Sequence, residues 1–352
     1  MTANAREPRN RDDGAGPIGQ PLNRRSLFGG LAVVALLSAA VYAALAALTE
    51  ADAVLGLIGS FPPGLLVTIL ALATAGIALR SLRWRWLMGQ AGYPVGISSA
   101  FYLQLSGLAA SVTPARAGEI IKPWLSRDIS GMPMSSGIAL VFAERVADLI
   151  AVCVLSLGAL SLLGAGVWMF AGVGLAVIGL VWVASSGRLH GAAVRVLSRH
   201  RLLKDRRASL ETISETIRRV LQVRVLAPSA MVSIAVWGLE GIGFVLCLRA
   251  FGFDGLPVAA AVSLYAVSVL VGALTFLPAG VGLTEASMAG LLIGAGMAGA
   301  DASAATIIMR LATLWWGVAL GWGALAARPG RLRGIVFGQD RTGLPTYNGS
   351  DD

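Results

Sequence analysis

The chain has few of the residues on which most catalytic and redox chemistry depends. Its 352 residues include two cysteines and two histidines, and only 13% are charged. Cys153 and Cys247 each lie alone in an apolar stretch, so neither a disulfide framework nor a CxxC metal site is supported. His190 and His200 lie in a basic loop, away from the apolar runs. We therefore expect no metal site, no cofactor and no catalytic residues.

The sequence is rich instead in apolar residues and in positive charge. Hydrophobic residues make up 56% of the chain, and the mean hydropathy is +0.74, which is typical of a polytopic membrane protein. The formal charge is +9, but the basic residues lie in short segments between apolar runs. That placement follows the positive-inside rule and argues against a nucleic-acid partner.

Apolar runs and basic loops divide the chain into one membrane domain and two tails. Residues 1–26 are polar and predict a disordered cytoplasmic tail. Residues 27–327 predict the transmembrane domain, with residues 188–224 as a basic cytoplasmic loop, and residues 328–352 predict a second cytoplasmic tail. We expect an all-α, polytopic bundle of about eight spans in a bacterial cytoplasmic (inner) membrane, with both termini in the cytoplasm.

Two further segments are predicted to lie at the cytoplasmic interface. Arg80, Arg83 and Arg85 follow an apolar span and, with two neighbouring tryptophans, predict a basic, aromatic boundary. In the basic loop, apolar residues recur at helical spacing, which predicts an amphipathic helix lying on the inner leaflet. These residues are Leu210, Ile213, Ile217, Val220 and Leu221.

Two stretches of the apolar sequence, residues 114–119 and 278–285, contain helix breakers and a charge. Both begin with the pattern PAxxG and end in a glutamate, Glu119 or Glu285. Proline removes a backbone donor and glycine weakens a helix, so each stretch predicts a broken or re-entrant helix. A pair of interrupted segments, one in each half, indicates the site of a transporter.

Spacing suggests that the two halves are repeats. Pro114 and Pro278 are 164 positions apart, and a charged helix position, Glu144 or Arg310, follows each motif glutamate after 25 residues. Charge placement has the two broken segments entered from opposite sides of the membrane, which predicts an inverted repeat. Because the identities are few, coincidental helix breaks are the alternative.

One predicted helix, residues 134–163, carries three charges inside the apolar sequence. Glu144 and Asp148 share a face, and Arg145 and Asp148 are spaced to pair. Either this is a local ion pair that makes the helix tolerable, or the charges line a cavity that also receives cations from other segments. Two further acids, Glu240 and Glu285, either are protonated or pair with Arg310.

Cations beside the broken helices make a phosphate site plausible. Arg116 and Lys122 flank the first break, where free amides at a helix end favour an anion, and topogenic charge is the alternative. The second break offers backbone amides at Gly280 and Gly282, and its cation would have to be Arg310.

Four segments occur in an order that resembles the lysylphosphatidylglycerol synthase transmembrane-region family, also called flippase-like or UPF0104 proteins. They are RSLRWRWLM (80–88), SVTPARAGEIIKP, VFAERVADL and TFLPAGVGLTEA. The resemblance covers residues 27–327 and implies a lipid flippase domain, here without an aminoacyltransferase domain. It also implies a set of site residues: Arg116, Gly118, Glu119, Glu144, Arg145, Asp148, Pro278, Gly280, Gly282 and Glu285. Lys122 stands where the family often has arginine, and a lysine does not make a bidentate phosphate contact.

The sequence therefore predicts a transporter that moves a lipid with an anionic phosphate headgroup, a phospholipid or a polyprenyl-phosphate-linked lipid, through a polar cavity. Arg116, Lys122 and Arg310 would hold the phosphate. One alternative is a membrane enzyme that transfers a group onto a lipid, with Asp148 or Glu119 as general base. The other is a non-catalytic subunit of a lipid-modifying complex. A homo-oligomer or a lipid-synthesising enzyme partner is compatible with each.

Overall fold

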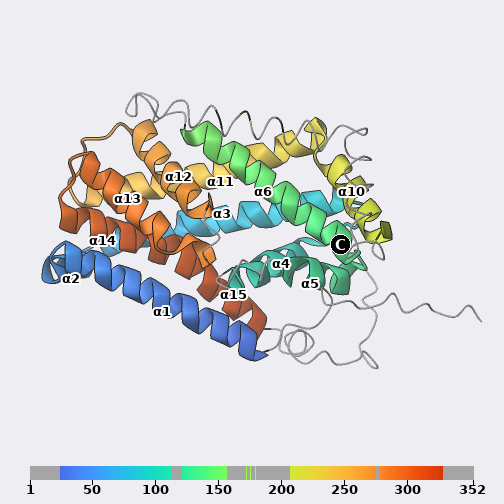
Figure 1. Cartoon of the computed structure of the whole chain (residues 1–352), viewed down its shortest axis with the longest axis horizontal. Helices are drawn as coiled ribbons and strands as arrows, with labels where there is room; N and C mark the ends of the chain where they lie inside the picture. Colours follow the sequence, from blue (N-terminus) through green and yellow to red (C-terminus); the bar gives the residue numbers. More distant parts are fainter. Residues whose placement is uncertain are drawn as a thin grey trace, which may run out of the picture.

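The computed structural model describes residues 24–111, 121–156, 207–274 and 278–327, together with the single positions 172, 175 and 179. Within these residues every regular element is a helix (Figure 1). The first PAxxG motif, including Arg116, Gly118 and Glu119, lies outside the described residues, as do residues 1–23, residues 188–206 of the basic loop and the predicted tail 328–352. Residues 24–26, which were assigned to the first tail, belong to the first helix.

The fold is a bundle of long helices with pairs of short helices between them. Its α-helices are α1 (Arg24–Leu48), α2 (Ala51–Gly59), α3 (Pro63–Gln90), α4 (Ile97–Ala109), α5 (Ile121–Ser130), α6 (Met134–Ser156), α10 (Arg207–Val220), α11 (Val223–Ala250), α12 (Val258–Leu274), α13 (Leu283–Gly294), α14 (Gly299–Arg310) and α15 (Trp316–Ala326). A 3₁₀ turn (Pro278–Gly280) precedes α13, and a π-helical turn (Leu311–Trp315) joins α14 to α15.

Three helices, α3, α11 and the continuous α14–α15 helix, are long and apolar enough to cross a membrane. Each has 28 residues, or about 42 Å at 1.5 Å per residue, against a hydrocarbon core of about 30 Å. The pair α1 and α2 bends by 111° and counts as a fourth span if it is taken as one broken helix. The predicted membrane helical bundle is confirmed, while the number of about eight spans stays a prediction.

The short helices form two hairpins that extend from opposite ends of the bundle (Figure 1). The pair α4 and α5 leaves after α3 and returns before α6, and the pair α12 and α13 leaves after α11 and returns before α14. Close approach within each hairpin depends on a glycine: a Cβ at Gly107 would lie 2.7 Å from the Lys122 side chain, and one at Gly272 would lie 1.8 Å from Thr284 Oγ1. The second helix break predicted from proline and glycine, at Pro278–Gly280, thus lies at the turn between α12 and α13.

The two halves have the same order of elements, long helix, short helix, short helix, long helix, and the same turns. The long helices α3 and α11 are each followed, two residues past their last residue, by a glycine of positive φ, Gly92 (φ 92°) and Gly252 (φ 68°), 160 positions apart. In both turns the next amide bonds to the carbonyl five residues back, Tyr93 to Met88 at 2.9 Å and Phe253 to Leu248 at 3.1 Å. This is the Schellman arrangement, which favours glycine because its φ is positive.

Farther along, the repeat continues with an offset of 165 positions. Gly131 (φ 71°) and Gly296 (φ 95°) both have positive φ, and each precedes a buried methionine. The same offset aligns ERVADL at 144–149 with MRLATL at 309–314. The 25-residue spacing from the motif glutamates aligns Arg310 with Glu144. The glycine turns at positions 131 and 296 instead align Arg310 with Arg145. The sequence alignment of the repeats is therefore wrong by one residue, because the loops differ in length.

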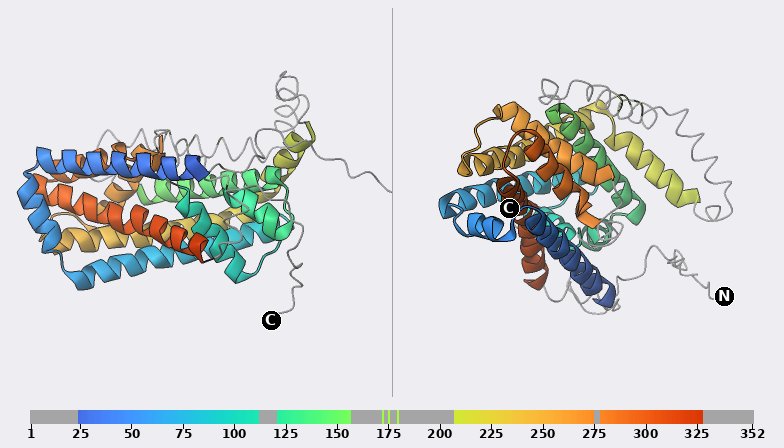
Figure 2. Two further views of the ribbon diagram at one scale, coloured as in Figure 1. Left: turned by 90° about the horizontal axis from the view of Figure 1, so that it is seen from below. Right: turned by 60° about the vertical axis from the view of Figure 1, so that its left-hand side comes forward.

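Helix directions are those of an inverted repeat. Helices α3 and α11 are antiparallel, since Val236 Cγ1 lies 3.6 Å from where a Cβ of Gly76 would be and Ile69 packs beside Gly243. Helix α15 contacts α3 through the bond from Trp316 Nε1 to Thr74 Oγ1 and runs in the same direction as α3, and α6 runs in the same direction as α11 (Figure 1). Helix α1 lies outside both repeats and packs along α14 and α15 (Figure 2).

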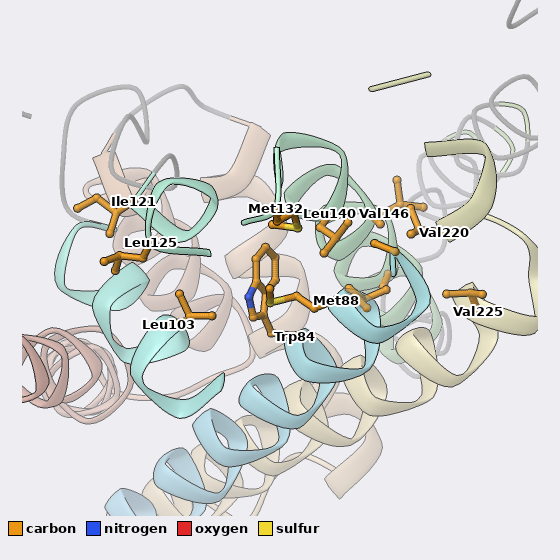
Figure 3. Packing of buried hydrophobic residues seen from close by; sticks show 14 of the residues in the cluster. Trp84, Met88, Leu103, Ile121, Leu125, Met132, Leu140, Val146, Val220 and Val225 are labelled. Atoms are coloured by element: carbon orange, nitrogen blue, oxygen red, sulfur yellow. The ribbon is translucent and has the colours of Figure 1, made fainter. Parts of the chain in front are cut away.

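One segment that was predicted to contact lipid instead packs on protein. Val220 of α10 and the next residue, Leu221, belong to a core that also contains Trp84 and Met88 of α3 (Figure 3). Thr216 Oγ1 and Ser136 Oγ of α6 are 3.3 Å apart. The prediction that α10 lies on the inner leaflet is wrong for this face, because α3 and α6 cover it.

Packing of α15 on α4 leaves no room for a side chain at Gly321, because a Cβ there would lie 2.5 Å from the amide nitrogen of Ala109 and from the carbonyl oxygen of Leu105. We expect Gly321→Ala to lower the free energy of unfolding by about 1–3 kcal/mol, as overpacking does. Thermal unfolding in detergent measures this. Gly323→Ala is the matched control, since nothing lies within 4 Å of its Cβ. Equal melting temperatures for the two variants would contradict the proposed close packing.

Candidate functional site

A buried arginine of α3 joins three helices in the middle of the bundle. Arg83 is 2% exposed. Its Nη1 donates to Asp148 Oδ1 at 2.6 Å and also contacts Ser233 Oγ of α11, and its Nη2 lies 3.3 Å from Glu144 Oε1. Both acids project from α6 one helical turn apart, so a single guanidinium bridges them. The predicted cytoplasmic boundary at Arg83 stays a prediction, but α3 continues past this residue to Gln90 and the Arg83 side chain is buried in protein.

Lys122 extends this charged network to the first hairpin. Its Nζ donates to Glu144 Oε2 at 2.6 Å and to Gln104 Oε1 at 2.9 Å, and it lies 3.8 Å from the centre of the Trp84 ring. Its aliphatic stem passes Gly107 of α4. These contacts neutralise the ammonium and fix it at the start of α5.

A second group of charges lies where α3 crosses α11. Arg80 Nη2 donates to Glu240 Oε1 at 3.0 Å, and Tyr265 Oη of α12 donates to Glu240 Oε2 at 2.7 Å. The Arg80 guanidinium also lies 4.8 Å from the centre of the Trp237 ring, and its Nη1 is 3.8 Å from Asp148 Oδ2. Among the alternatives for Glu240, pairing is therefore observed, but its partner is Arg80.

At the second helix break, the charges satisfy the backbone. Glu285 Oε2 accepts the Gly282 amide at 2.7 Å, and Glu285 Oε1 lies 2.6 Å from Arg310 Nε. Arg310 Nη2 donates to the carbonyl oxygen of Ala279 at 2.9 Å. The pairing of Glu285 with Arg310 is confirmed. The prediction that the Gly282 amide is open to an anion is wrong, because Glu285 caps it.

A cavity of about 210 Å³ lies between the two halves. Its described lining combines apolar side chains with six charged ones, four basic and two acidic, which leaves two positive charges in excess. The charged residues are Arg80, Lys122, Arg145, Arg310, Glu144 and Glu240. Arg145, with its side chain 42% exposed and its Nη2 3.4 Å from Asp148 Oδ2, is the most accessible arginine among them. A cavity of this charge favours an anionic group.

Of the residues predicted for the site, Lys122, Glu144, Arg145 and Arg310 line this cavity. Asp148 lies behind it on Arg83, and Glu285 and Gly282 form the cap of α13. The backbone of Pro278 and Gly280 forms the turn before that cap.

Sequence reasoning missed three residues of the site, Arg80, Arg83 and Tyr265. A signal existed for the first two. The glycine at position 92 and the proline at 94 mark the end of the helix, and extending the predicted span from Leu82 toward them places both arginines inside α3.

No cluster of three or more His, Cys, Asp or Glu side chains suited to a metal ion occurs among the described residues. The two acids of α6 are already held by Arg83 and Lys122. This part of the site is arranged to bind charges and shows no free carboxylate pair for acid–base chemistry.

Removing the central arginine tests whether this network holds the bundle together. We expect Arg83→Met to lower the free energy of unfolding by about 3–5 kcal/mol, because it leaves Asp148 and Glu144 buried with one cation fewer. Denaturant titration in detergent measures this. Arg85→Met is the matched control, since Arg85 is two residues away on an exposed side of the same helix. Adding Asp148→Asn to Arg83→Met should restore part of the loss, and equal stability of the two single variants would contradict the role of Arg83.

Comparisons with known proteins agree with this architecture. Two UPF0104 membrane proteins of Methanothermobacter thermautotrophicus are 26% and 27% identical over 276 and 275 residues, which are 73% and 71% of this chain and 81% of each relative. Glycosyltransferase AglD of Haloferax volcanii is 27% identical over 276 residues, 66% of this chain but 43% of that protein. The family model described as the lysylphosphatidylglycerol synthase TM region matches residues 28–321. The chain therefore belongs to this family of multi-pass membrane proteins.

Proposed function

We propose that the protein is a lipid transporter that moves an anionic phosphate headgroup between leaflets. The observation that carries the proposal is the cavity between the inverted halves, with its four basic and two acidic side chains. A volume of about 210 Å³ suits a headgroup and leaves no room for acyl or prenyl chains, which would remain in the surrounding lipid.

The charged residues divide into those that hold the bundle and those that face the ligand. Short, buried ion pairs join Arg83 to Asp148 and Lys122 to Glu144. We therefore assign Arg83, Lys122 and Asp148 to the framework that holds the bundle together. Arg145 and Arg80 are the more accessible cations, and we assign them to the phosphate, with Arg310 beside them. Arg116, Gly118 and Glu119, which lie outside the described residues, are proposed to complete the first hairpin tip.

The inverted arrangement supports transport. Two hairpins that extend from opposite ends toward one cavity provide one candidate barrier on each side, and inverted repeats with a central site are a recurrent architecture of transporters. We place the protein in the cytoplasmic membrane with both termini in the cytoplasm, and we propose that it is not an enzyme. A lipid-synthesising enzyme remains a suitable partner for it.

The name of the Haloferax relative favours a second candidate, a membrane enzyme that transfers a group onto a lipid. The shared region is less than half of that protein, so its activity is not assigned to this region. Asp148, a predicted general base, is bound by Arg83 and accepts a hydrogen bond from Ser233 at 3.1 Å. Those contacts stabilise the carboxylate and make it a poor base.

Reconstitution in liposomes tests transport. Fluorescent phosphatidylglycerol should exchange between leaflets faster than in empty vesicles, and Arg145→Gln should slow it by at least about tenfold, since a hydrogen bond to a charged group contributes about 1.5–3 kcal/mol. Arg127→Gln, an exposed arginine of α5 outside the cavity, is the matched control.

Exchange equal to empty vesicles for aminoacylated, polyprenyl-phosphate and ordinary lipids would overturn the proposal. Formation of a modified lipid by the purified protein, lost in Asp148→Asn with the fold intact, would establish the enzyme instead.

A further inference from the structure

Arg80 and Glu240 occupy a special place in the repeat. They are 160 positions apart, which is the offset that relates α3 to α11, so each is the counterpart of the other. Gly76 and Val236, one turn away, are also counterparts and also pack together. The pseudo-two-fold axis between the halves therefore passes through the Arg80–Glu240 ion pair. The same two side chains line the cavity, each 13% exposed.

A phosphate in this cavity would compete with Glu240 for Arg80. The guanidinium of Arg80 is held by Glu240 at 3.0 Å and more loosely by Asp148 at 3.8 Å, so it is the arginine of the crossing that an incoming anion can divert. When Arg80 turns to a phosphate, Glu240 keeps the hydroxyl of Tyr265 as a partner but loses its cation. A carboxylate without a counter-ion in a low-dielectric site takes up a proton.

We propose that Glu240 is a coupling-proton site, and that one proton binds to it for each anionic phosphate headgroup that binds at Arg80. This rests on the proposed transport function. One O–H bond forms between Glu240 and a proton delivered from water, and it breaks again when the phosphate leaves and Arg80 returns. The added negative charge and the added proton cancel, so the loaded cavity has the same net charge as the empty one.

Groups on the neighbouring helices favour Glu240 for this role. On α6, Glu144 and Asp148 are each bound to the guanidinium of Arg83 and remain charged whether or not Arg80 moves, and Arg145 faces the cavity beside Asp148. The remaining charged or titratable groups around the cavity are Lys122 on α5, Tyr265 on α12 and Arg310 on α14. Lys122 and Arg310 have acids of their own, Glu144 and Glu285. Among the described lining residues, Glu240 is the acid whose cation is accessible to the ligand.

Proteoliposomes with a pH gradient test the proposal. With trace fluorescent phosphatidylglycerol, a lumen one pH unit more alkaline than the outside should drive inward accumulation of about tenfold for one coupled proton. A protonophore with a potassium ionophore should abolish the accumulation while exchange continues. Wild-type exchange that does not respond to the gradient would overturn proton coupling but leave transport standing. Exchange equal to empty vesicles would overturn both.

Variants locate the proton site. Glu240→Gln should lose the accumulation, because the amide cannot bind a proton reversibly, and the lipid exchange of this variant should not respond to the pH gradient. Asp254→Asn is the control, since that acid is exposed at the end of α11 outside the cavity. An unchanged response in Glu240→Gln would exclude Glu240.

A second measurement needs no variant. When short-chain phosphatidylglycerol is added to the wild-type protein in weakly buffered detergent, the protein should take up close to one proton per lipid bound. Binding of lipid without proton uptake would overturn the proposal even if Glu240→Gln fails to fold.

Discussion

The bundle depends on the neutralisation of Arg83 inside apolar surroundings. An unpaired charge at the centre of a membrane helix is opposed by about 2.5–3.5 kcal/mol on insertion scales. Arg83 of α3 meets this constraint by binding Asp148 and Glu144 of α6 together with Ser233 of α11, and Glu144 in turn binds Lys122 of α5. The charges that would oppose insertion singly thus fasten four helices, and they fix one wall of the cavity.

This charged network belongs to the first half alone. At the corresponding positions the second half has Gly243 for Arg83, Met309 for Glu144 and Thr313 for Asp148. The Met309 side chain packs beside Gly243, as Glu144 does beside Arg83. Replacement of a buried ion pair by packed apolar groups preserves a fold when both partners change together. The halves thus share a backbone plan and differ in polarity, so the cavity has unequal walls.

The helices, the second break and the charged face of α6 could be predicted from the sequence, because hydropathy, proline and residue spacing are local signals. The ion-pair partner of each charged side chain could not be predicted in this way. Arg80 and Arg83 come at the end of an apolar run and so predict a membrane boundary. The neighbouring sequence gives no sign that Glu240 and Asp148, far along the chain, are their partners. The prediction of an anion site at the second break was wrong for a related reason: a glutamate three residues after Gly282 is a helix-capping signal as well as a charge. Long-range pairing decides both cases.

The ion pair where α3 crosses α11 also constrains how the two halves of the protein can have evolved. If the two halves were once identical chains that associated in opposite orientations, positions 80 and 240 held the same residue and faced each other across the axis. Two arginines or two glutamates there would repel, and two valines at positions 76 and 236 would crowd where glycine now meets valine. A pair of opposite charges at a symmetry axis requires two different genes or one fused gene. The present Arg80–Glu240 bond can therefore have arisen only after the halves were free to diverge.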